Sequence, residues 1–495
     1  MVPALFAVLT GAVLLVWPAL LNGYPVLFSD TGGLLDMGLA GDMGWDKPWV
    51  YGPFLAMTSL GLSLWGSVAA QGLLLSHLLW LSQAVVAPPR TLRHVALCAV
   101  LAVGTAAPWF ASLLLPDSFT PLVVLCLFVL AFGPGRVGRG ALAWAGVVGT
   151  VAIASHLSHL IVAAAVVAVA GLLRWRLPWR PAMPLVAALL FLLGSNLAGN
   201  GVLAVSPYGS VFMLARLVGD GPGRAYVDAA CPAAGWRICA WRGRLPSDSD
   251  EFLWHPNGPV WADGFGPIRY APEAAKLVPA IIAAYPGGVL LAAAANALRQ
   301  AGLVRVGDAL VALHLDVALL PRLELYFPAR EAAAYRASLQ AADRLGAIAA
   351  PFAPLHIAVL LAGVAGSLWI AGRGSLLLRE RVGVRRSWGR SRKLGATSAR
   401  GPASDGMALA RPLTPTVSRS EREKQLAGCL RGLAVLALTG VLANAVATGA
   451  LSGPHDRYQA RIAWLVMLAP LLAYAARRDV SCRATSAGDM LTSAS

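Results

Sequence analysis

The feature that most constrains the fold is a series of uncharged apolar runs, several of which reach the length of about 20 residues that a helix needs to cross a bilayer. The runs lack the alternation of polar and apolar residues that marks barrel strands, so we expect helices. Charged residues make up only 13% of the chain, against about 25% in soluble domains. The sequence therefore predicts an all-α, polytopic integral membrane protein.

We expect about ten transmembrane helices, or eleven if residues 52–86 cross twice. That stretch is too long for one helix and short for two, and we place its break at Trp65-Gly66-Ser67. Residues 276–348 look largely helical, and their apolar centre fits a membrane-surface helix or a short hairpin. The expected segments are an N-terminal transmembrane module (1–205) with an acidic first outer loop (22–51), an extracytoplasmic region of loops and amphipathic helix (206–351), a transmembrane helix (352–371), a basic disordered cytoplasmic linker (372–427), a C-terminal transmembrane hairpin (428–478) and a disordered tail (479–495).

The net charge of +16 is concentrated beside the membrane helices. Residues 372–425 hold 13 Lys or Arg and 4 Asp or Glu, which is typical of a cytoplasmic loop and could also contact anionic lipid headgroups. With the other basic loops placed inside, the acidic loop and residues 206–351 lie outside. We therefore expect the lipid bilayer, and no nucleic acid, as the partner of the basic charge.

Five of the six cysteines fall into two groups. Cys98, Cys126 and Cys429 lie in apolar runs, where cysteine usually packs as a small apolar residue. Cys231 and Cys239 lie in a polar region rich in Trp, Arg and Pro. If that region is extracytoplasmic, the compartment favours a disulfide between them.

Four carboxylates lie in the loop between the first two apolar runs, at Asp30, Asp36, Asp42 and Asp46. Acids close to a bilayer are costly and usually functional, although a solvated loop would carry them too. Two roles fit Asp30. It could cap a helix that starts at Thr31, as could Ser29, or it could be a general base that takes a proton from an acceptor hydroxyl.

Further charged and imidazole side chains collect on the same outer face, and each has a structural alternative. Arg457 and Arg461 are four residues apart, so on a helix they share a face and could bind a phosphate. Alternatively, Asp456 forms a salt bridge with one of them. His156 and His159 could contact substrate, bind a metal with Asp30 or Asp117, or bond to carbonyls freed at a helix break. The candidate substrate-binding residues are Asp117, His156, His159, His455, Asp456, Arg457 and Arg461.

The acidic loop resembles that of the GT-C superfamily of membrane glycosyltransferases. The matching residues are Asp30, Gly41-Asp42 and Asp46-Lys47-Pro48, followed by Tyr51 and Pro53. Within that superfamily the chain is most similar in style to aminoarabinose transferases and protein O-mannosyltransferases. The resemblance implies transfer of a sugar from a polyprenyl-phosphate carrier at the outer face. It also implies that Asp30, the acidic residue of the first loop, is the catalytic residue. The chain departs from the usual pattern in having Thr31 in place of a second acid and Trp49 in place of a second proline.

The expected function is therefore transfer of a polyprenyl-phosphate-linked sugar to a glycan, lipid or protein acceptor, at the outer face of a bacterial inner membrane. Asp30 would be the base, and Arg457 and Arg461 would hold the carrier phosphate. No cofactor is certain, and a divalent cation is compatible with the sequence. A transporter or lipid-linked-sugar flippase and a non-catalytic membrane scaffold are the alternatives.

Overall fold

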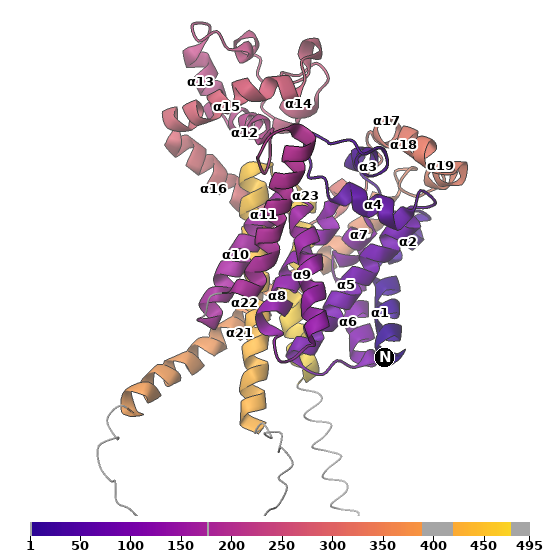
Figure 1. Ribbon diagram of the computed structural model, residues 1–495, viewed down its shortest axis with the longest axis vertical. Coiled ribbons are helices and arrows are strands. Elements are labelled where there is room, and N and C mark those ends of the chain that lie inside the picture. Colours follow the sequence, from indigo (N-terminus) through magenta and orange to yellow (C-terminus); the bar gives the residue numbers. More distant parts are fainter. Residues whose placement is uncertain (1, 176–177, 389–418, 477–495) are drawn as a thin grey trace, which may run out of the picture.

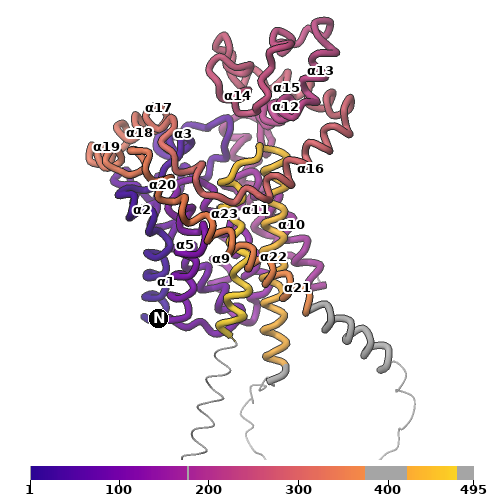
Figure 2. Tube along the Cα trace, turned by 180° about the vertical axis from the view of Figure 1, so that it is seen from behind, coloured from indigo at the N-terminus to yellow at the C-terminus, as the bar shows by residue number. Residues whose placement is uncertain are grey.

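The computed structural model describes residues 2–175, 178–388 and 419–476, and in this part of the chain all regular structure is helical, with two isolated β-bridges and no sheet. Long helices form a bundle, and two groups of shorter helices lie at one end of it (Figures 1 and 2). The N-terminal half contains α1 (Val2–Leu15), α2 (Trp17–Asn22), α3 (Ser29–Leu35), α4 (Tyr51–Ser59), α5 (Trp65–Val86), α6 (Thr91–Gly104), α7 (Ala107–Ser112), α8 (Thr120–Phe132), α9 (Arg139–Ala154), α10 (Leu157–Arg174) and α11 (Trp179–Asn200).

The remaining helices include both groups of short helices and the end of the bundle. They are α12 (Gly209–Gly219), α13 (Pro222–Ala230), α14 (Ser249–Trp254), α15 (Pro267–Ala284), α16 (Pro286–Gly302), α17 (Leu315–Ala318), α18 (Leu320–Tyr326), α19 (Ala329–Arg336), α20 (Leu345–Ala349), α21 (Ala353–Trp388), α22 (Arg419–Leu451) and α23 (Asp456–Ala463). We call α12 to α15 the disulfide lobe and α17 to α19 the cover segment.

Six helical segments of the described chain are long and apolar enough to cross a membrane. They are Trp65–Val86, Leu157–Arg174, Trp179–Asn200, Leu345–Arg373, Glu421–Leu451 and Asp456–Ala476. The pair α15 and α16, bent by 99°, would be a seventh, and shorter apolar helices such as α1, α6, α8 and α9 pack beside them. These are the helices of a multi-pass membrane protein, as the apolar runs predict.

Helix α8 lies at the centre of the bundle. Every residue from Thr120 to Phe132 is buried, because α5, α9, α10 and α22 pack around it. A helix without an exposed face needs no polar stripe, which explains the uniformly apolar sequence TPLVVLCLFVLAF. Gly432 of α22 allows close packing, since an added Cβ would lie 2.4 Å from the ring of Phe132.

The stretch 52–86 breaks earlier than expected. Helix α4 ends at Ser59, and Leu60 and Gly61 follow in the left-handed region with φ of 54° and 66°. Trp65-Gly66-Ser67, the expected break, instead opens α5. Gly66 fits there because its Cα lies against α4, where a Cβ would be 2.2 Å from the carbonyl oxygen of Thr58.

The basic linker is only partly within the described residues. Helix α21 continues to Trp388 and α22 begins at Arg419, so both described ends of the segment 372–427 are helical rather than disordered. The expectation of disorder for residues 389–418, and for the tail 479–495, falls outside the described residues.

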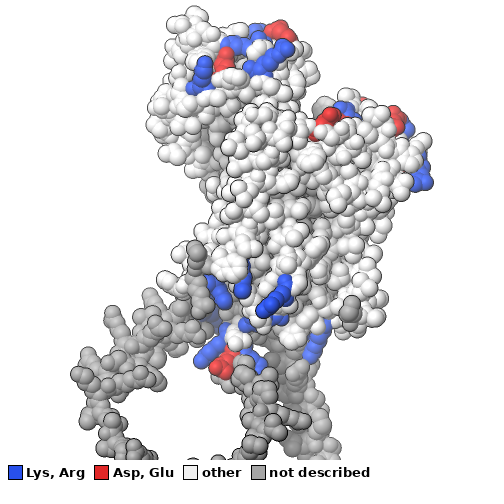
Figure 3. Space-filling model, in the orientation of Figure 1, with Lys and Arg blue, Asp and Glu red and all other residues white. Residues whose placement is uncertain are grey.

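Charge is distributed unequally between the two ends of the bundle (Figure 3). Basic residues gather at the end where α8 leads into α9 and α10 ends, which is also the end of the N-terminus (Figure 1). Both signs occur on the short helices at the other end, and the middle is nearly free of charge in this view. The positive-inside rule predicts that the first end faces the cytoplasm, with the disulfide lobe and the cover segment on the other side.

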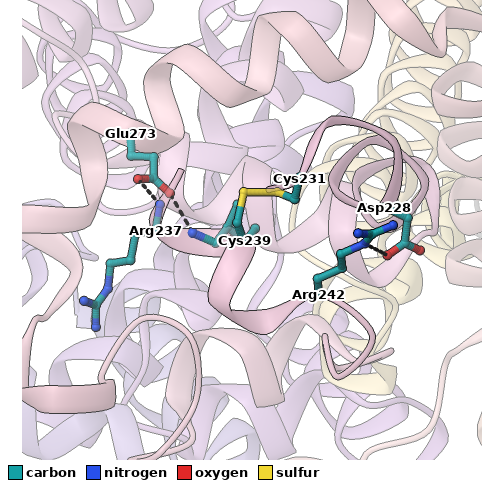
Figure 4. Close-up of a disulfide and its surroundings, with 7 residues drawn as sticks. Asp228, Cys231, Arg237, Cys239, Arg242 and Glu273 are labelled. Carbon is teal, nitrogen blue, oxygen red and sulfur yellow. Dashed lines mark hydrogen bonds and ion pairs between the residues drawn. A yellow bond between two sulfur atoms is a disulfide. The ribbon is translucent and has the colours of Figure 1, made fainter. Parts of the chain in front are cut away.

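The disulfide lobe has its own apolar core, separate from that of the bundle. A disulfide joins Cys231 to Cys239, as expected for an extracytoplasmic region (Figure 4). Beside it, the carboxylate of Glu273 accepts hydrogen bonds from the backbone N–H groups of Arg237 and Ile238 at 2.8 and 3.0 Å. The bridge and this carboxylate fix the irregular segment between α13 and α14 onto α15.

Candidate functional site

Asp30 lies in the first turn of α3, at the end of the bundle that carries the short helices (Figure 1). The preceding residues are held extended because Val26 exchanges backbone hydrogen bonds with Ser112 and Leu114 at 3.0 and 2.9 Å. Phe28 is the N-cap residue, and its N–H donates to the hydroxyl of Thr31 at 3.0 Å. The helix is therefore not capped by Ser29 or Asp30 as the sequence allowed, and the Asp30 carboxylate has no capping role.

Asp30 borders an open cavity of about 280 Å³ formed by the acidic loop. Its side chain is 36% exposed, and Lys47 Nζ lies 3.6 Å from its carboxylate. Lys47 also forms an ion pair with Asp46. Burial works against the charge of Lys47, but the carboxylates of Asp30 and Asp46 outweigh it and raise the pKa of the ammonium group. The cavity is lined by Ser29, Asp30, Gly33, Asp36, Met37, Asp42, Gly44, Asp46 and Lys47.

The cover segment neutralises a different acid of the loop. Asp36 accepts hydrogen bonds from Arg322 Nε at 3.1 Å and from the Tyr326 hydroxyl at 2.9 Å. Gly32 allows the contact, since an added Cβ would lie 2.0 Å from the carbonyl oxygen of Ala318. Asp36 therefore fastens the cover segment to α3, whereas Asp30 remains open to the cavity.

Trp45 joins the acidic loop to the disulfide lobe. Its ring lies 5.0 Å from that of Phe212 and 5.4 Å from that of Trp254, measured between centroids. Aromatic pairs at such distances contribute beyond their buried area. Trp45 therefore holds the part of the loop that follows α3 against the lobe.

The first residues of α23 contact the lobe side of the structure. His455 Nε2 lies 3.2 Å from Asp250 of α14, and the backbone of His455 exchanges hydrogen bonds with the side chain of Gln300 at 2.7 and 2.9 Å. Asp456 accepts from the backbone N–H of Arg305 at 2.9 Å. Both His455 and Asp456, expected to bind substrate, have these partners within the fold.

Arg457 extends from α23 toward the acidic loop. Its guanidinium lies 4.2 Å from the ring centroid of Phe28 and 4.9 Å from that of Tyr458, and one amino group donates to the Tyr458 hydroxyl at 3.2 Å. Asp30 and Asp117 act on it electrostatically. Among the described residues no carboxylate forms an ion pair with Arg457, so this cation keeps hydrogen-bond donors for an anion.

Arg461, one turn further on, is occupied. It is fully buried and donates to Asp117 Oδ1 at 2.9 Å, to Ser158 Oγ at 3.1 Å and to Asn444 Oδ1 at 3.0 Å. Asp117 is itself 4% exposed. The two residues form a buried salt bridge that joins α23 to the segment before α8, and the expected pairing of Asp456 with an arginine is not what the structure shows.

The two histidines at the start of α10 differ in how many of their ring nitrogens form hydrogen bonds within the described chain. His159 uses both ring nitrogens, with Nε2 2.7 Å from the Thr120 hydroxyl and Nδ1 2.6 Å from the carbonyl oxygen of Ala152. His156 is the N-cap residue of α10, and its Nδ1 accepts the N–H of Ser158 at 3.2 Å. Its Nε2 has no hydrogen-bond partner in the described part of the chain.

The site therefore brings together residues from both ends of the chain. Asp30, Lys47, His156 and Arg457 interact electrostatically or by direct contact. Sequence reasoning gave no role to Lys47, although it is the one cation of the acidic loop, nor to Phe28 and Tyr458, which position Arg457. No group of three His, Cys, Asp or Glu side chains within the described ranges is arranged to hold a metal ion.

Fold and site together define a multi-pass helical membrane protein with a charged, open cavity at the end of the bundle that carries the short helices. Comparison of the chain with protein-family models, with curated proteins and with solved structures found no match.

Proposed function

We propose that this protein is a GT-C-like glycosyltransferase of a bacterial inner membrane. It would transfer a sugar from a polyprenyl-phosphate carrier to an acceptor hydroxyl at the outer face. The observation that carries the proposal is that Arg457, a guanidinium with no carboxylate partner in the described chain, stacks on Phe28, two residues before the solvent-accessible carboxylate of Asp30. The carboxylate would take a proton and the guanidinium would hold a phosphate.

The reaction follows from these two roles. The acceptor oxygen attacks C1 of the sugar as its proton passes to the carboxylate of Asp30. The bond between C1 and the carrier phosphate oxygen breaks, and polyprenyl phosphate leaves with the electron pair. Arg457, together with Lys47 beside Asp30, would stabilise the negative charge that grows on the phosphate. Arg461 would act indirectly, because Asp117 already neutralises it.

The helix arrangement supports the expected number of crossings. We take α1, α6, α8 and α9 as crossings in addition to the six long spans, which gives ten. With ten crossings both described ends of the chain lie on the cytoplasmic side. The cavity then lies at the level where a carrier phosphate in the outer leaflet would be found.

Release of polyprenyl phosphate from synthetic polyprenyl-phosphate sugars tests the proposal without knowledge of the acceptor. The purified full chain in lipid nanodiscs is given a panel of pentose, hexose and amino-sugar donors, with cell-envelope extract as the source of acceptors. We expect Asp30→Asn to release product roughly a hundredfold more slowly than the native protein, since loss of a general base costs at least that much.

Asp228→Asn is the matched control. Asp228 lies on the lobe surface, 58% exposed, and its pair with Arg242 spans 3.9 Å, so its loss should be nearly neutral. Native turnover by Asp30→Asn, at equal expression and thermal stability, would remove Asp30 from catalysis.

A further inference from the structure

A continuous chain of hydrogen bonds links the buried salt bridge to His156. Asp117 accepts from Arg461 Nη1 at 2.9 Å, and Arg461 Nη2 donates to Ser158 Oγ at 3.1 Å. Ser158 Oγ in turn lies 2.7 Å from His156 Nδ1. This oxygen accepts from the guanidinium, and its own proton is left to donate to the imidazole nitrogen wherever that nitrogen is unprotonated.

The chain determines which nitrogen of His156 carries the proton. A backbone N–H can only donate, and that of Ser158 donates to Nδ1 at 3.2 Å, so Nδ1 is the unprotonated nitrogen. In the neutral ring the proton is therefore on Nε2. His159 has the opposite arrangement, since its Nδ1 faces the carbonyl oxygen of Ala152, which can only accept.

The surroundings keep His156 neutral and favour an anion beside it. Burial, followed by the positive charges of Arg461, Arg457 and Lys47, holds the pKa of His156 well below its ordinary value. Arg461 and Lys47 have carboxylate partners, whereas Arg457 has none in the described chain. In the described chain the Nε2–H of His156 has no acceptor, and Arg457 uses one amino group on the Tyr458 hydroxyl, so both side chains keep donors for an anion in one electropositive region.

We propose that His156 is a neutral hydrogen-bond donor whose Nε2–H binds an oxygen of the carrier phosphate beside Arg457, and that Asp117, Arg461 and Ser158 are positioning residues that hold it in this tautomer. The inference rests on the proposed function for the identity of the phosphate. It adds a role for the buried network, which acts on the ligand only through His156. It also explains how Arg461 matters to the site without contacting substrate.

Two substitutions at residue 156 separate the donor from the helix cap. In His156→Asn the side-chain oxygen can still accept the N–H of Ser158, and Asn is a good N-cap residue, but the side chain is too short to reach the position of Nε2. In His156→Gln an amide N–H₂ group reaches that position. Both are made in the full chain and compared with the native protein by thermal unfolding.

The probe is farnesyl monophosphate, with farnesol as the partner that lacks the phosphate. Hydrogen bonds to charged groups are among the stronger ones. We expect His156→Asn to bind farnesyl monophosphate roughly ten- to a hundredfold more weakly, His156→Gln to bind within a few fold of the native protein, and farnesol binding to be unchanged throughout. Native affinity in a folded His156→Asn protein, or an equal loss for farnesol, would overturn the proposal.

Nitrogen NMR of histidine-labelled protein gives a second measurement that does not depend on how the Gln variant folds. The resonances that disappear in His156→Asn are those of His156. They should show a protonated Nε2 and an unprotonated Nδ1, and the Nε2 signal should shift when farnesyl monophosphate is added. A proton on Nδ1, or no shift on addition, contradicts the proposal.

The outcome is distinguishable from failure of the proposed function. If Asp30→Asn keeps full turnover while His156→Asn loses phosphate affinity, the transferase mechanism is wrong and the anion site stands. If Asp30→Asn is inactive while His156→Asn binds farnesyl monophosphate normally, the transferase mechanism stands and the anion site at His156 is wrong.

Discussion

Whether a charged side chain already has a partner separates structural from functional residues at this site. Arg457 and Arg461 lie on the same helix one turn apart, yet Arg461 is fully buried against Asp117, whereas Arg457 stacks on Phe28 and Tyr458 and pairs with no carboxylate of the described chain. Sequence spacing predicts that both face one way but does not reveal a partner from 344 residues away in the chain. Spacing likewise does not reveal the two hydrogen-bond partners of His159, which come from α8 and α9.

The Asp117–Arg461 pair supports a prediction at this scale. Arg461→Met leaves a buried carboxylate without its cation, which typically costs about 3–5 kcal/mol. We expect a loss of stability of that order on unfolding in mixed micelles. The double variant Asp117→Asn with Arg461→Met removes the uncompensated charge, so it should be more stable than Arg461→Met alone. A double variant that is no better would show that the pair is not energetically coupled.

The contact between helices α3 and α17 could be predicted from the sequence only in part. The acidic loop of 22–51 could be recognised from sequence because its acids interrupt an apolar pattern. Its cover could not, since buried apolar residues recur every four positions from Leu315 to Phe327 but do not reveal that the segment packs on α3 at Gly32 and Asp36. Helix ends were predicted less well for the same reason: the break after Ser59 depends on how α4 meets Gly66.

The contact at Gly32 predicts how the cover segment can be loosened. Gly32→Ala would place a Cβ 2.0 Å from the carbonyl oxygen of Ala318, a backbone atom, whereas nothing lies within 4 Å of a Cβ at Gly33. The two glycines are neighbours in the same helix, so Gly33→Ala is the matched control for helix propensity. We expect faster hydrogen exchange across residues 315–336 in Gly32→Ala only. Equal exchange in both variants would mean that α17 does not depend on this contact.

The whole molecule is oriented by where its charges lie, and this supports the last prediction. The basic end should face the cytoplasm and the disulfide lobe the outside. Asn257 in the lobe and Gly140 at the start of α9 are both exposed, and an added Cβ at Gly140 meets nothing within 4 Å. Cys482 lies outside the described residues, so the cysteine variants at both positions are made together with Cys482→Ser. Because Cys98, Cys126 and Cys429 are buried and Cys231 is bonded to Cys239, a membrane-impermeant maleimide should leave the Cys482→Ser parent protein nearly unlabelled. In intact spheroplasts it should label Asn257→Cys and not Gly140→Cys, which becomes reactive only after lysis. Labelling of Gly140→Cys before lysis would place the cavity on the cytoplasmic side, where the acceptors and the outer-leaflet phosphate of the proposed reaction could not reach it.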